Sequence, residues 1–429
     1  MSLPSPHWRP GKRVVVVGGG PGGISTGLAF LKRGYDVRIF ERQPVCKALG
    51  GGVLLCVPVL AILRSYGMDV DELGSYTVTY FKNSKGQERT KLIFNPEIEK
   101  RMGIKGWHYG VLRASAYKQM LQLLPDGILQ EGQEFESYTE RNDEVEVNFA
   151  SGTKITADVV VGADGVRSGV SRQAFGDPGL FHVGIRVWLA WCESVPGVIK
   201  PNYGYVSHDW HRQANFFPMR HEGKPGFEWW IVEPAYEGKP FPEKPDEIKA
   251  YISDILKDWA DPMPLFIEAT DFKHHIFRWE IYNRPSMKKW SRGRVVCVGD
   301  AVHPVSPYAA YGMGMAIEDG YHLACSLDGV DLRDAHAVRA GFELYEKERV
   351  NYVNHNMEFA RFLGRVFHGL PYPLAWVRDF IFDNTPFLKR YLAKGYLEEA
   401  EKETMKLKEL FVSKGSLHQR EWGGYHTAY

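Results

Sequence analysis

The chain contains few cysteines, no excess of charge and no long hydrophobic run. Five cysteines in 429 residues, with no Cys-x-x-Cys pair, argue against a disulfide framework and against a paired-cysteine zinc or redox motif. The 53 Lys and Arg balance 52 Asp and Glu, so the net charge gives no indication of nucleic-acid binding. The longest apolar run, residues 53–63, is too short for a membrane span, which needs about 20 residues.

These absences predict the compartment of the protein and the partners that it does not bind. Residues 1–13 lack an apolar stretch, so we expect no signal peptide, and the few cysteines favour a reducing compartment. We therefore expect a cytoplasmic protein with no nucleic-acid partner and no integral membrane segment. The oligomeric state stays open. We also expect no metal site, because His274 and His275 are adjacent and their side chains diverge, and no metal-binding motif occurs.

Glycine and aromatic residues, in contrast, are abundant. The sequence has 44 glycines, above the usual share of roughly 7%. Aromatic residues reach 13%, including 12 Trp. Excess glycine indicates close backbone turns or contacts of the backbone with a ligand. Excess aromatics indicate large flat apolar surfaces, in the core or in a pocket.

Residues 14–41 predict a strand, a helix and a second strand. The turn after the first strand reads G-x-G-x-x-G, formed by Gly18, Gly20 and Gly23. The first glycine permits the tight turn, the second lets the backbone approach a pyrophosphate, and the third lets the helix pack on the strand. Glu41 ends the second strand, where a carboxylate binds ribose hydroxyls, and we add its neighbour Arg42 to the candidates. This unit predicts a dinucleotide site.

Two later segments identify the dinucleotide. Residues 158–172 read DVVVGADGVRSGVSR, and residues 294–307 read RVVCVGDAVHPVSP. Together with the glycine turn, they resemble the class A FAD-dependent aromatic monooxygenases, the family of para-hydroxybenzoate and salicylate hydroxylases. The resemblance covers most of residues 14–330, with the three motifs in the family's order.

The resemblance implies further contacts to FAD. Asp300 resembles the acid that holds the ribityl hydroxyls, and Arg113 resembles the arginine that reaches the phosphate and ribityl region. Gly51 and Gly52 resemble the glycine strip that runs beside the flavin. The other implied FAD-binding residues are Asp164, Pro307, Gly312, Met313 and Gly314. Met313 and Met315 depart from the family's small or amide residues, and packing in the core is an equal alternative for both.

Pattern and resemblance together predict an α/β fold. A Rossmann-like FAD-binding domain is interleaved with a mainly antiparallel β-sheet substrate domain, and helices follow at the C-terminus. The predicted FAD-binding domain comprises residues 1–75, 105–180 and 285–335. The predicted substrate domain comprises residues 76–104 and 181–284, and the C-terminal helical region residues 336–429.

The substrate pocket is expected in the aromatic-rich middle of the chain. Arg186 lies where relatives often carry an arginine facing the flavin, and it could bind a substrate carboxylate as a catalytic residue. An arginine that pairs with a structural acid or points to solvent is an equal alternative. His208, His211 and His303 are candidates for proton transfer, although a lone histidine is more often structural. The substrate-contact candidates are Tyr203, Tyr205, His208, Phe217 and Trp229. About half of the four aromatic residues Tyr203, Tyr205, Trp229 and Trp230 are expected in the core, because strand alternation sends neighbours to opposite faces.

The resemblance implies the activity. NADPH or NADH would bind transiently and reduce FAD, since there is no second G-x-G-x-x-G. Reduced flavin and O2 would form a C4a-hydroperoxide that hydroxylates an aromatic or other electron-rich small molecule. Alternatives are an epoxidase or oxidative tailoring enzyme of natural-product biosynthesis, and an FAD-dependent reductase without oxygenation. A flavin halogenase is less favoured, because its W-x-W-x-I-P strand is missing.

Overall fold

A computed structural model describes residues 8–47, 51–141, 143–193, 199–221, 223–306 and 311–411. The chain forms two compact units, each assembled from separate segments. Unit 1 contains residues 1–48, 117–181 and 282–360, and unit 2 contains residues 49–116, 182–281 and 361–429. The predicted α/β class with interleaved parts is confirmed. Each unit is described by itself.

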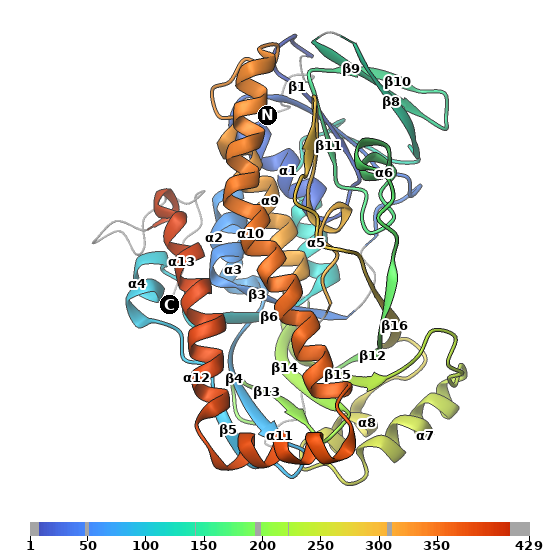
Figure 1. Ribbon diagram of the computed structural model, residues 1–429, viewed down its shortest axis with the longest axis vertical. Helices are drawn as coiled ribbons and strands as arrows, with labels where there is room; N and C mark the ends of the chain where they lie inside the picture. Colours follow the sequence, from blue (N-terminus) through green and yellow to red (C-terminus); the bar gives the residue numbers. More distant parts are fainter. Residues whose placement is uncertain are drawn as a thin grey trace. The chain divides into compact units, whose positions relative to one another are not determined.

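Unit 1 is built on a six-stranded sheet, of which β1 and β11 are labelled in Figure 1. Its order is β17 (Ser291–Arg292), β18 (Val295–Cys297), β11 (Val159–Gly162), β1 (Arg13–Val17), β2 (Asp36–Phe40) and β7 (Leu129–Gln130). Neighbours pair in parallel except β17, which is antiparallel at the edge. Every residue of β1 is buried, as its run of valines predicts for a central parallel strand.

Helices and a small second sheet complete unit 1. Helix α1 (Pro21–Lys32) packs on α9 (Gly312–Ser326), with Gly320 so close to Thr26 that a Cβ there would lie 2.6 Å from the Thr26 backbone nitrogen. The small sheet is antiparallel, and it is followed by α6. These elements are β8 (Phe135–Arg141), β9 (Glu144–Phe149), β10 (Lys154–Ala157) and α6 (Gly169–Phe175).

Unit 2 is built on a nine-stranded, mainly antiparallel sheet. The path runs β16 (Ile276–Asn283), β12 (Phe181–Glu193), β15 (Lys224–Pro234), β14 (Gln213–His221), β13 (Tyr203–His208), β4 (Ser75–Asn83), β6 (His108–Leu112) and β3 (Gly52–Cys56), with β5 (Glu88–Lys91) paired to β4. One face packs an aromatic core against α7 (Pro245–Leu256) and α8 (Met263–Ala269). The other face carries a smaller apolar cluster around Phe217.

The remaining helices lie between strands of this sheet or follow its last strand in sequence. They are α2 (Val57–Tyr66), α3 (Val70–Leu73), α4 (Pro96–Met102), α5 (Arg113–Gln122), α10 (Ala335–His368), α11 (Tyr372–Asn384), α12 (Phe387–Leu392) and α13 (Glu398–Lys406). The compact units differ from the predicted domains, since residues 49–75 and 105–116 fall in unit 2 because β3 and β6 pair within its sheet. The predicted functional domains stay a prediction.

Candidate functional site

The glycine turn of unit 1 has the geometry of a dinucleotide cradle. Gly18 has φ +111°, and a Cβ at that position would lie 2.3 Å from the Ala163 carbonyl oxygen. A Cβ at Gly23 would lie 1.9 Å from the Gly18 carbonyl oxygen, so only glycine fits. A Cβ at Gly20 would meet nothing within 4 Å. The turn is therefore closed toward the protein and open at its middle glycine.

Two groups around this turn suit the two ends of a nucleotide. Helix α1 begins just after Gly20, and no side chain caps its first turn, so its N–H groups and positive dipole end are available to phosphate. Glu41 follows β2, and its Oε2 accepts a hydrogen bond of 2.7 Å from the Gly19 backbone N–H. The residues present therefore fit the adenosine diphosphate part of FAD. Arg42 is exposed beside Glu41.

The two aspartates of the later motifs have different surroundings. Asp164 is a structural cap, because its Oδ2 accepts from the backbone N–H groups of Gly169 (2.7 Å) and Val170 (3.2 Å) at the start of α6. Burial raises the pKa of its carboxyl. Asp300 follows β18 and is exposed. Asp300 is thus the better placed of the two to meet a ligand.

A buried charge cluster fixes the turn that carries Asp300. Asp319 on α9 accepts 2.9 Å hydrogen bonds from the Gly299 N–H and from Arg349 Nε, and it also pairs with His303. Arg349 donates a second bond of 2.8 Å to Glu318. These partners hold the pKa of Asp319 at about 2 despite its burial. His303 is therefore structural, and sequence reasoning missed Arg349.

The start of α9 resembles the start of α1 in being uncapped. No side chain caps the first turn of α9, and a Cβ at Gly312 would meet nothing within 4 Å. Met313 is half-buried beside it, and Gly314 is buried. Met315 is fully buried in the core, which settles its two alternatives in favour of packing. Pro307 lies outside the described residues.

The glycine strip in unit 2 is packed against a carboxyl group. A Cβ at Gly51 would lie 2.2 Å from Glu228 Oε1, and a Cβ at Gly52 would lie 3.1 Å from a ring carbon of Phe217. The Gly51 carbonyl accepts a 3.2 Å hydrogen bond from the Arg113 N–H, so β3 and the start of α5 are joined here. Glycine at both positions lets this strip lie directly on the sheet.

The face of the sheet under this strip carries Phe217 and a group that the sequence analysis missed. Glu228 on β15 is directly opposite Phe217 on β14 and Trp191 on β12, so the three side chains form a row on one face. The rings of Phe217 and Trp230 lie 5.5 Å apart. A charged residue inside the strand-like run 227–232 was the available signal for Glu228.

Three of the predicted substrate contacts lie on the face of the unit 2 sheet that is opposite to Phe217. Tyr205 and Trp229 belong to the buried core against α7 and α8, and Tyr203 packs on it. Trp229 Nε1 donates a 2.9 Å hydrogen bond to Thr270 Oγ1. The expectation that these three line a pocket is corrected, because strand alternation places them on the core face while Phe217 lies on the other.

Arg186 is a structural residue. It is 1% exposed, and its Nε donates to Glu280 Oε1 at 2.7 Å. Its Nη2 donates to the Lys239 carbonyl at 2.6 Å, and the guanidinium lies over the Phe241 ring. The predicted catalytic role in binding a substrate carboxylate is therefore not met, and the alternative of a structural ion pair is what the structure shows.

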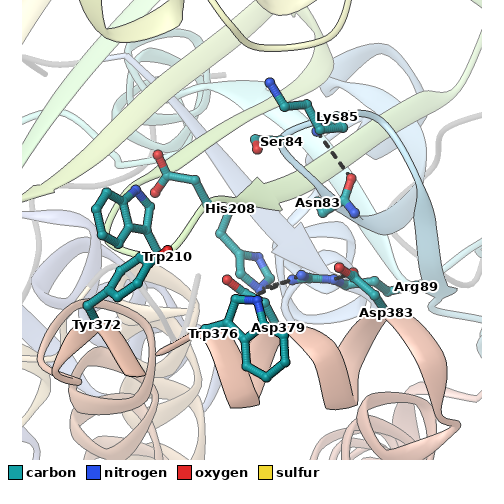
Figure 2. A pocket seen from close by; sticks show the side chains of 11 residues that line it. Asn83, Ser84, Lys85, Arg89, His208, Trp210, Tyr372, Trp376, Asp379 and Asp383 are labelled. Atoms are coloured by element: carbon teal, nitrogen blue, oxygen red, sulfur yellow. Dashed lines mark hydrogen bonds and ion pairs between the residues drawn. The ribbon is translucent and has the colours of Figure 1, made fainter. Parts of the chain in front are cut away.

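His208 lines a separate cavity of about 370 Å³ in unit 2, shown in Figure 2. By strand alternation it lies on the opposite face of β13 from Tyr205, whose partner across the strands, Phe216, belongs to the aromatic core. Its Nε2 meets the Arg89 guanidinium, which also contacts Asp379 at 3.3 Å. Burial and Arg89 hold the pKa of His208 well below its usual value. It is therefore neutral and not a proton donor at neutral pH.

Two further features concern only the described residues of the chain. In these ranges, no group of three or more His, Cys, Asp or Glu side chains is placed to hold a metal ion. No helix in the same ranges combines the length and the apolar character that crossing a membrane requires.

Comparison with known proteins gives the family. The family described as "FAD binding domain" matches residues 12–360. A 6-hydroxynicotinate 3-monooxygenase of Bordetella bronchiseptica is 30% identical over 371 residues, covering 79% of this chain and 87% of that enzyme. Zeaxanthin epoxidase of Nicotiana plumbaginifolia is 29% identical over 344 residues, covering 75% of this chain and 49% of that enzyme.

A solved structure shares the fold. Klebsiella pneumoniae HpxO, complexed with FAD and uric acid, superposes with a TM-score of 0.74 at 21% identity, covering 94% of this chain and 97% of that one. The family match spans the glycine turn, the glycine strip and both later motifs. The chain belongs to this FAD-binding family and is a flavoprotein monooxygenase of the class A aromatic hydroxylase type.

Proposed function

We propose that the protein uses NADH or NADPH and O2 to hydroxylate an electron-rich, hydroxylated aromatic or heteroaromatic ring. The observation that carries this proposal is the cradle at Gly18, Gly20 and Gly23 with Glu41 beside it. When bound, FAD supplies the hydride acceptance and oxygen chemistry that side chains cannot perform. The protein residues bind the cofactor and orient the ring.

The described residues divide these tasks. The uncapped first turn of α1 and the carboxylate of Glu41 would hold the two phosphates and the ribose. Asp300 is exposed after β18 and would hold the ribityl hydroxyls, with its turn fixed by Asp319. In unit 2, the apolar face with Phe217 and Trp230 would hold the flat ring and exclude water.

We propose that Arg186 does not bind a carboxylate group of the substrate. That guanidinium is fully engaged by Glu280 and by backbone carbonyls. The relative that acts on 6-hydroxynicotinate supports a hydroxylated nitrogen heteroaromatic as the general class. An epoxidase is the second candidate, supported by the similarity to zeaxanthin epoxidase. None of the five cysteines, all of which lie in the described ranges, forms a disulfide bond, and this supports a reducing compartment such as the cytoplasm.

The first experiment tests the FAD site. The variant Gly20→Val places its side chain where the structure has open space, so we expect it to fold and to lose bound FAD at least tenfold. Ala150→Val, an exposed enlargement in unit 1, is the matched control and should keep FAD. Flavin absorbance after gel filtration measures both. A Gly20→Val protein with full FAD content would contradict the assignment.

The second experiment tests the reaction. NAD(P)H oxidation and O2 uptake by the FAD-loaded protein are followed against phenols, hydroxypyridines, quinolones and a cyclic alkene. We expect one aromatic class to accelerate both, with a product heavier by one oxygen atom. Stimulation by the alkene alone would favour the epoxidase. Flavin reduction without O2 consumption would indicate a reductase instead.

A further inference from the structure

Glu228 is a buried acid that no described protein group satisfies. Its side chain is 0% exposed, and neither carboxyl oxygen forms a hydrogen bond within the described part of the chain. The Gly52 backbone N–H favours the charged form of the carboxyl, but burial outweighs this effect, and neither carboxyl oxygen has a hydrogen-bond partner among the described residues. Buried polar groups in proteins are almost always paired, so an unpaired acid requires an explanation.

The surroundings of Glu228 are those of a ligand-binding face. Its neighbours across the strands are two aromatic residues, Phe217 and Trp191. The glycine strip lies directly over it, since a Cβ at Gly51 would come 2.2 Å from Oε1. Trp191 in turn stacks on His275 at 3.7 Å. A few polar groups among mainly apolar and aromatic side chains are the usual lining of a small-molecule site.

The protonation state of Glu228 follows from this environment. Burial raises the pKa of its carboxyl well above the usual value, and no described cation offsets the effect. A neutral carboxylic acid donates one hydrogen bond and accepts another side by side. These two hydrogen bonds complement a ring that carries adjacent C=O and N–H groups, because the acid O–H donates to the C=O and the acid C=O accepts from the N–H. An anionic ligand would face an acceptor oxygen with no cation to compensate its charge.

We propose that Glu228 is a specificity-determining residue that binds the adjacent N–H and C=O groups of an uncharged heteroaromatic substrate through a neutral carboxylic acid. This inference rests on the proposed function and narrows its substrate class to lactam-like rings such as 2-pyridones and 2-quinolones. Phe217 and Trp191 flank Glu228 on the sheet, and Gly51 and Gly52 of the glycine strip cover the carboxyl with backbone alone.

The test is the affinity of the FAD-loaded enzyme for 2-quinolone, measured by quenching of tryptophan fluorescence. Wild-type protein should bind 2-quinolone at least tenfold more tightly than N-methyl-2-quinolone, which lacks the N–H, or quinoline-2-carboxylate, which is anionic. Glu228→Gln keeps a donor and an acceptor and should stay within about threefold of wild type. Glu228→Leu should lose at least tenfold and should no longer distinguish the N-methyl compound.

Folding is monitored by thermal melting and by FAD content. Glu228→Leu removes an unpaired polar group, so it should melt no lower than wild type, and Glu228→Gln provides a second folded variant. Equal affinity of all three proteins for 2-quinolone, tighter binding of quinoline-2-carboxylate, or no binding of 2-quinolone to wild type would leave Glu228 a structural acid only. These results would overturn the inference while FAD binding and substrate-stimulated O2 uptake persist. Loss of FAD from wild type would instead overturn the proposed function.

Discussion

Two buried carboxyl groups, Asp319 in unit 1 and Glu228 in unit 2, are equally hidden from solvent and have opposite surroundings. Asp319 meets Arg349, His303 and a backbone N–H, so the pKa of its carboxyl falls to about 2. Glu228 meets aromatic rings and glycine backbone, so its pKa rises. The difference teaches that a buried acid with partners is part of the architecture, whereas one without partners is available to a ligand.

The largest loss of unfolding free energy is expected when the buried charge cluster of Arg349, Asp319 and Glu318 is broken. Arg349→Met leaves Asp319 and Glu318 buried without their shared cation, which should cost about 3–5 kcal/mol of unfolding free energy. Urea denaturation of the variant and wild type measures the difference. Glu346, which binds the Trp290 backbone N–H at 2.8 Å from the same helix, offers a milder control as Glu346→Gln. A loss below about 1 kcal/mol for Arg349→Met would show that the cluster is not structural.

Replacement of Glu228, the acid without partners, should change the unfolding free energy in the opposite direction. Glu228→Leu replaces a desolvated carboxyl by an apolar side chain of similar size, so unfolding free energy should be unchanged or higher by about 1–3 kcal/mol. The same urea experiment provides the comparison. A clear destabilisation would mean that Glu228 has a structural partner, and the contrast with Asp319 would be lost.

The pH dependence of stability should also separate the two acids. The folded-state pKa of Glu228 is raised, so its folded state binds a proton more tightly, and stability falls as pH rises above about 4.5, by up to about 1.4 kcal/mol per unit. The folded-state pKa of Asp319 is depressed, so its contribution is present above about 3.8 and is lost as pH falls toward about 2.

The measurement is the stability difference between wild type and Glu228→Gln as a function of pH. The glutamine does not titrate, so this difference should shift in favour of the variant between about pH 4.5 and 7. A flat difference over that range would show that Glu228 ionises as an ordinary glutamate.

Local patterns were sufficient to predict the fold class and the cofactor family. The strand–helix–strand unit, its glycines and Glu41 are contiguous in sequence, and their geometry follows from short-range backbone requirements. Asp300 follows its strand as the motif predicts. The division into compact units was less predictable, because β3 and β6 join the second sheet through pairings between distant segments.

The substrate face could not be predicted from local pattern. Tyr205, Phe217 and Trp229 are all aromatic residues in strands, and which of them faces α7 and α8 depends on register between strands. Arg186 was left with two alternatives because its partner Glu280 is far away in sequence. Arg349 was missed for the same reason, since it reaches Asp319 from another helix.

The protonation state of Glu228 is the most direct test of the account. Infrared difference spectra between wild type and Glu228→Gln at neutral pH report the C=O stretch of a protonated carboxylic acid. The account predicts that this band is present in wild type, absent in the variant, and shifted when 2-quinolone is added. A difference spectrum with only ionised carboxylate bands, unchanged by the ligand, would contradict it.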